Sequence, residues 1–128
     1  MEFGIGEFHD GFAFDIEGGV WVTCVVSNKV IRISSNGQRE IIINDSDVSH
    51  VNHVEEAYKK GVLERKHLDN IVSAKLRNIS SICFGGSDLK TVFLGCLLGD
   101  EIATFKSRIA GLQSTHWEPI RLMNKNFP

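Results

Sequence analysis

Residues 9–37 read HDGFAFDIEGGVWVTCVVSNKVIRISSNG, and this stretch decides the fold. Short runs of β-branched and aromatic residues alternate there with turn residues such as Gly18, Asn28 and Gly37, which is typical of antiparallel strands. Because each connection is only a few residues long, consecutive runs must pair with one another, and an up-and-down meander is predicted. The expected strands are Phe12–Asp15, Val20–Val25, Lys29–Ile33 and Arg39–Ile43.

The next segment changes from strand to helix periodicity. Apolar residues recur every three or four positions between Ser46 and Gly61, with charged residues between them, which predicts an amphipathic helix. Asp45, Ser46 or Asp47 can cap its start by accepting a backbone N–H bond. Gly61 is placed to end it, and a second short helical piece is expected within residues 66–76. The apolar positions of the first helix are Val48, Val51, Val54, Ala57 and Tyr58.

Strand periodicity returns at residue 79, so the chain repeats a unit of similar length. Blade-like segments 9–44 and 79–123 enclose a helical segment 46–77, and a unit of about 40 residues has the length of a propeller blade. The predicted fold class is mainly β, with two four-stranded antiparallel propeller-type blades and a helical insertion between them, in one partial-propeller domain over residues 1–128. The strands expected in the second unit are Ile79–Phe84, Thr91–Gly95, Glu101–Phe105 and a last extended run around His116–Leu122.

Two motifs carry a resemblance to a known family. In residues 9–37, Asp10-Gly11 is followed by an acidic glycine turn, a Val-Trp-Val strand and a Val-Ile-Arg strand; residues 81–86 read SICFGG before another aromatic strand. In order and spacing the chain resembles the senescence-marker-protein, gluconolactonase and luciferin-regenerating-enzyme family of six-bladed β-propellers. The resemblance implies the C-terminal two-blade portion of a lactonase-like propeller.

The resemblance also implies a divalent metal, usually Ca²⁺ or Zn²⁺, at the mouth of the central channel. Asp10 corresponds to the Asp of the family's Pro-Asp-Gly motif, which makes it the candidate catalytic residue and metal ligand. His9 stands in place of the motif's Pro and either adds a ligand or loosens the turn; Asn28 is a further candidate contributor. The family's early Glu and mid-chain Asn belong to blades that this chain does not contain. Calcium takes six to eight oxygen ligands, so a single carboxylate would bind it weakly.

Other conspicuous residues are interpreted as structural. Asp10 itself has the alternative of bonding only the backbone of its own turn, as Asp before Gly often does. We interpret Trp21, in a predicted strand, as a packing residue between blades, and assign no catalytic role to Trp117. His50, His53 and Glu56 recur every three residues on the predicted helix. We interpret these three as its solvated polar face rather than as a set of metal ligands.

The composition of the chain indicates which partners and which cellular location to expect. A net charge of −2 gives no electrostatic footprint for nucleic acid or for an anionic membrane, so neither is an expected partner. No apolar run approaches the roughly 18 residues of a membrane span, and residues 1–10 hold acids where a signal peptide would be basic, so a cytoplasmic location is expected. Cys24, Cys83 and Cys96 form no CxxC pair and are expected to be buried as small apolar residues.

Two propeller-type blades cannot close a ring, and an isolated pair would expose two apolar sheet faces. A homo-oligomer is therefore expected. Three chains would restore six blades in a trimer; a dimer packed sheet on sheet, or the predicted helix Asp47–Lys60 folded across a face, are the alternatives. Two functions follow. The first is a noncatalytic binding or assembly module, which the missing family ligands favour; the second is a metal-dependent hydrolase of small lactones whose site is assembled between subunits.

Overall fold

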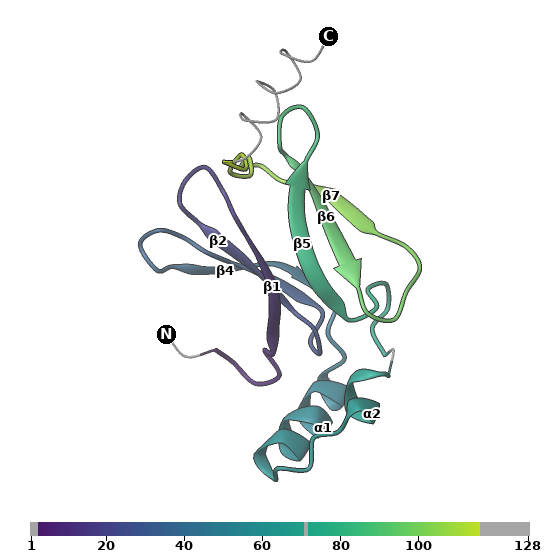
Figure 1. The fold of residues 1–128 in the computed structure, drawn as a ribbon. Helices are drawn as coiled ribbons and strands as arrows, with labels where there is room; N and C mark the ends of the chain where they lie inside the picture. Colours follow the sequence, from purple (N-terminus) through teal and green to yellow (C-terminus); the bar gives the residue numbers. More distant parts are fainter. Residues whose placement is uncertain (1–2, 71, 116–128) are drawn as a thin grey trace.

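The strands form two antiparallel sheets in the computed structural model of the protein, which describes residues 3–70 and 72–115 (Figure 1). Sheet 1 contains four strands in chain order, β1 (His9–Phe14), β2 (Val20–Cys24), β3 (Lys29–Ile33) and β4 (Arg39–Asn44). Sheet 2 contains β5 (Ile79–Gly85), β6 (Thr91–Cys96) and β7 (Ala103–Lys106). The prediction of a mainly β chain that begins with a four-stranded meander is confirmed. The strand expected at His116–Leu122 lies outside the described residues.

Two helices separate the sheets in the sequence and lie together beyond one end of them (Figure 1). Helix α1 (Val48–Lys59) begins after Asp47, whose Oδ1 accepts a bond from the N–H of His50 at 2.8 Å, so Asp47 is the cap among the three candidates. Gly61 follows with φ +69°, the left-handed conformation that ends helices. Helix α2 (Arg65–Leu68) is shorter than expected.

Another element binds the backbone at the far end of the range predicted for the second helix. The Asp45 carboxylate accepts bonds from the N–H groups of Lys75 and Leu76, at 2.8 and 2.7 Å. These donors are therefore used by the loop after β4 instead of by a helix. The contact ties the segment that enters sheet 2 to the end of sheet 1.

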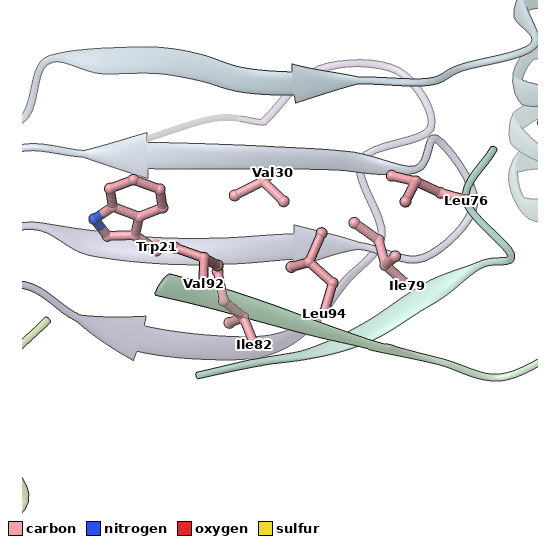
Figure 2. Close-up of a cluster of buried hydrophobic side chains, with 7 residues drawn as sticks. All are labelled: Trp21, Val30, Leu76, Ile79, Ile82, Val92 and Leu94. Carbon is pink, nitrogen blue, oxygen red and sulfur yellow. The ribbon is translucent and has the colours of Figure 1, made fainter. Parts of the chain in front are cut away.

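The main core lies between the two sheets (Figure 2). Trp21 and Val30 project from sheet 1 towards Val92 and Leu94 of sheet 2, and all four are almost fully buried. The Trp21 ring meets Phe84 edge to face, with ring centroids 5.2 Å apart. The interpretation of Trp21 as a residue that packs between the sheets is thereby confirmed.

A buried carboxylate holds the β1–β2 turn against β3. Asp15 is 1% exposed and accepts four bonds: from the backbone N–H groups of Glu17 and Gly19, from Trp21 Nε1 and from Arg32 Nε. Burial alone would raise the pKa of Asp15, but the bonds from Arg32, Trp21, Gly19 and Glu17 outweigh it and hold the pKa below its ordinary value. Gly19 is required here, since a Cβ would lie 2.8 Å from the Arg32 guanidinium and closer still to the carboxylate.

The sheets are also joined at both ends by backbone and amide bonds. At the Asp15 end, the N–H of Ile16 donates to Ala110 O at 3.0 Å and the N–H of Leu112 donates to Phe14 O at 2.9 Å. At the other end, buried Asn28 donates from Nδ2 to Asn78 Oδ1 at 3.2 Å and accepts from the N–H of Ile79. Both asparagines have positive φ, 47° and 58°, a conformation that Asn tolerates better than most residues.

The cysteine prediction is correct for one residue of three. Cys24 is buried, but Cys96 is half-buried and Cys83 is exposed. Cys83 alternates along β5 with Ile82 and Phe84, which pack into the core, so its side chain lies on the opposite face of sheet 2. An apolar strand was therefore not sufficient evidence of burial.

The helices are too short or too polar to cross a membrane, as far as the described part of the chain is concerned.

We predict that Asp15→Asn lowers the free energy of unfolding by about 3 kcal/mol, because it removes the buried counter-charge of the Arg32 guanidinium and leaves the exposed Glu17 carboxylate as its partner. Urea unfolding followed by circular dichroism measures this. Glu17→Gln is the matched control: its carboxylate is 61% exposed and pairs with Arg32 at 3.2 Å, and we expect a loss below about 1 kcal/mol. Equal losses for the two variants would contradict the role given to Asp15.

Candidate functional site

The predicted site residue Asp10 lies on a β-bulge near the start of β1. His9 pairs with Cys24 and Phe12 with Val22, so Asp10 and Gly11 together oppose Thr23. Thr23 Oγ1 accepts from the N–H of Gly11 at 3.0 Å and lies 3.2 Å from its carbonyl oxygen. A bulge redirects the side chains of the strand that carries it. Here it leaves the Asp10 side chain exposed.

Gly11 holds this bulge against sheet 2. A Cβ on Gly11 would lie 2.5 Å from Ser80 O and 2.8 Å from Ser81 Cα, so only glycine allows β1 and β5 to approach this closely. The register of β5 shifts at the same place, between Ile79 and Ser81. The irregular segments of β1 and β5, the first strand of each sheet, therefore meet at the Asp10-Gly11 motif, where the two sheets come together.

His9 is also exposed, but its ring is engaged by the N-terminal segment. It contacts Phe3 edge to face, with ring centroids 3.8 Å apart. Partial burial lowers the pKa of His9, and although Glu7 acts to raise it, the Arg39 cation adds to the lowering. His9 is therefore a neutral imidazole at neutral pH.

Asn28 does not join Asp10 and His9. It lies in the β2–β3 turn, is 1% exposed, and uses its amide in the bonds to Asn78 and Ile79 described above. Its role is to connect the sheets. The sequence could not show this, because the partner Asn78 lies 50 positions away.

The described residues do not provide a complete metal site within one chain. Over residues 3–70 and 72–115, His, Cys, Asp and Glu side chains form no group of three that could hold a metal ion. Asp10, alone or with His9, supplies fewer ligands than a calcium or zinc site requires. Any metal bound at Asp10 would need ligands from outside this set.

A second feature of sheet 1 is its apolar outer face, whose residues only the strand register identifies. Ala13, Trp21 and Val30 point into the core, so the residues that alternate with them face away from sheet 2. The strand register places these residues in two rows across the sheet. We name the exposed or half-buried apolar members the outer patch: Phe12, Phe14, Val20, Val22, Ile33 and Ile41.

Charged residues border the outer patch on the β3–β4 side. Lys29 and Arg39 lie on the same face and both pair with the Glu7 carboxylate, Lys29 at 3.4 Å. The Glu7 side chain is only 2% exposed. Ile31, at the centre of the face, is fully buried. The side chains of Phe12 and Phe14 are exposed to solvent, and their rings contact each other with centroids 5.6 Å apart.

Strand β1 thus carries both the Asp10 bulge and the two aromatic residues of the outer patch. The chain matches no protein-family model and no curated protein. What the chain does is therefore argued from the geometry of this strand and its sheet.

We predict that Gly11→Ala lowers the free energy of unfolding by about 1–3 kcal/mol, since the new methyl group must push β5 away from β1. Gly4→Ala serves as the control, because its Cβ would meet only the Glu7 carboxylate, at 3.3 Å. Thermal or urea unfolding of the two variants makes the comparison. An unchanged stability of Gly11→Ala would mean that the β1–β5 contact is looser than the structure indicates.

Proposed function

We propose that the chain is a noncatalytic binding and assembly module, built from two propeller-type blades with a helical insertion, whose outer patch binds a second copy of the same chain. The observation that carries the proposal is the exposure of large apolar side chains on one sheet face. Phe12, Phe14 and Ile41 are 60%, 48% and 49% exposed. Phe12 and Phe14 contact each other. Half-buried Val20, Val22 and Ile33 continue the apolar face towards Ile41, although Ile31, between Val22 and Ile41, is fully buried.

Such a surface is costly to leave in water. Burying a large apolar side chain contributes about 1.5–3 kcal/mol, and contiguous exposed apolar surfaces mark interaction sites. A sheet in a folded domain normally buries its apolar face against another layer. The inner face of sheet 1 is buried against sheet 2. The outer face is also apolar, because it carries the outer patch, but no described layer covers Phe12 and Phe14 there.

The outer face of sheet 2 is the surface that we propose as the partner. Phe93 lies at its centre, half-buried, and pairs with Cys83 and Thr104. The small residues Ser81 and Gly95 pair with each other farther along the same two strands. Bulky phenyl rings pack well against small residues, since large and small side chains then interdigitate. This complementarity favours a head-to-tail arrangement, in which three chains would close a ring of six sheets. A face-to-face dimer of outer patches is the other homo-oligomer.

A cytoplasmic location forms part of the proposal. All three cysteines are free, and Cys83 is exposed, which suits a reducing compartment. Burial, with a smaller contribution from Glu7, raises the pKa of Cys24 to about 11, so that thiol is unreactive at neutral pH.

We predict that the protein is an oligomer in solution and that Phe12→Ser/Phe14→Ser shifts it to monomer, because the double substitution removes the aromatic part of the patch. Light scattering coupled to size exclusion gives the mass of each form. The control is Ile102→Ser, which removes a side chain that is 66% exposed outside the patch and leaves the mass unchanged. A monomeric parent chain at high concentration would overturn the proposal.

A second candidate function, a metal-dependent hydrolase of small lactones, is favoured by one observation: the bulge presents the Asp10 carboxylate to solvent where the two sheets meet. In a ring of three chains, three copies of Asp10 would lie around one axis. The described residues of a single copy do not supply the ligands that a metal requires, so the site would have to form between copies.

For this candidate we predict calcium or zinc binding at one site per oligomer, lost in Asp10→Asn, since the shared carboxylates would be its charged ligands. Isothermal titration calorimetry with each ion measures the stoichiometry. Glu56→Gln, which alters a carboxylate that is 70% exposed on α1, is the matched control. An oligomer that binds neither ion would reject the hydrolase and leave the assembly module standing.

A further inference from the structure

Three histidines meet where α1 and α2 come together. His53 of α1 and His67 of α2 have ring centroids 5.5 Å apart, with 41° between their planes. His50, one turn before His53, is 8% exposed, and its Nε2 is buried without a hydrogen-bond partner among the described residues. This differs from the predicted solvated polar face, because α1 turns His50 inward together with Val51 and Val54.

The two helices and their connection cover an apolar cluster at the end of sheet 1. Val51 and Val54 of α1 pack on Val25 and Val26 of the β2–β3 turn. Leu63, just before α2, and Leu68, its last residue, pack against the same cluster, as does Phe8. Helix α2 is only four residues long, so packing and a few specific bonds must hold it in place.

One of those bonds is made by His67. Its Nδ1 lies 2.9 Å from the backbone N of Glu64 and accepts that N–H when the ring is neutral and carries its proton on Nε2. The bond satisfies a free donor at the start of α2. The same Nδ1 lies 3.0 Å from Glu64 O, so an imidazolium would donate to that carbonyl oxygen instead. Protonation of His67 therefore removes the acceptor of the Glu64 N–H and changes the bonding at the helix start.

We propose that His50, His53 and His67 form an acid-sensitive clasp, which holds α2 against α1 while the rings are neutral and releases it when they are protonated. Two or three imidazolium ions at this spacing would repel one another. The charges on the buried His50 and His67 would be only partly solvated, whereas His53 is exposed. Release of α2 would uncover Leu63, Leu68 and the valines beneath them. The clasp would thus expose a second apolar surface, apart from the outer patch, in mildly acidic conditions.

Burial and nearby charges determine whether the clasp is more stable at high or at low pH. Burial lowers the pKa of His50 below its ordinary value of 6.5; Asp47 acts to raise it, and His53 and His67 lower it further. Glu64, at the start of α2, is the other nearby acid and is paired with Lys66 at 2.8 Å. A base whose pKa falls on folding binds more protons when unfolded. The stability of the clasp is therefore complete above pH 6.5 and declines as the pH falls below that value.

Hydrogen exchange followed by mass spectrometry, at pH 7.5 and pH 5.5 on the full chain, tests the proposal. After correction for the intrinsic exchange rate, we expect the protection of residues 64–70 to fall severalfold at the lower pH, because protonation then favours the released form. Protection of β5 and β6 should stay constant and serves as the internal measure of folding. Equal protection of residues 64–70 at both pH values would overturn the proposal.

Variants separate the clasp from general acid sensitivity. His53→Gln/His67→Gln should abolish most of the pH dependence, and His50→Gln should reduce it, because each removes titrating rings from the cluster. His9→Gln is the matched control, since His9 lies on β1 and its pKa is also lowered. Full pH dependence in His53→Gln/His67→Gln with folded sheets, or its loss in His9→Gln, would show that the clasp is not its origin.

Discussion

The buried carboxylate of Asp15 is the constraint on which the rest of the structure depends. It joins the β1–β2 turn to Trp21 and to Arg32 on β3, and Trp21 in turn forms the centre of the core between the sheets. The charge is kept in the interior because four donors surround it. One ion pair therefore sets the position of the turn, the orientation of the indole ring and the packing of sheet 2 on sheet 1.

Strand β1 links that constraint to the surface. Its C-terminal end leads into Asp15, its bulge lies on β5, and its alternate residues Phe12 and Phe14 form the open part of the outer patch. Because Gly11 permits the close approach to β5 and Asp15 fixes the following turn, the two phenyl rings have a defined position. If the outer patch binds a second copy of the chain, as proposed, this preorganisation would reduce the entropy lost on docking.

The sequence predicted the elements whose causes are local. Periodicity and short turns gave the meander of sheet 1 and helix α1, and the cap positions Asp47 and Gly61 were among the expected residues. Contacts between distant residues were not predictable in the same way. The bonds from Lys75 and Leu76 to Asp45, and the inward turn of His50, depend on which segments meet in space. The outer patch follows from alternation once the core face is known, but the sequence alone does not say which face that is.

The bonds at both ends of the sheet pair have a consequence for assembly. With Asn28 bound to Asn78 at one end and Ile16 bound to Ala110 at the other, sheets 1 and 2 are braced as one rigid unit. Neither sheet can be exchanged or added without the other. Any closed assembly made from this chain alone would therefore grow by two sheets at a time and contain an even number of them.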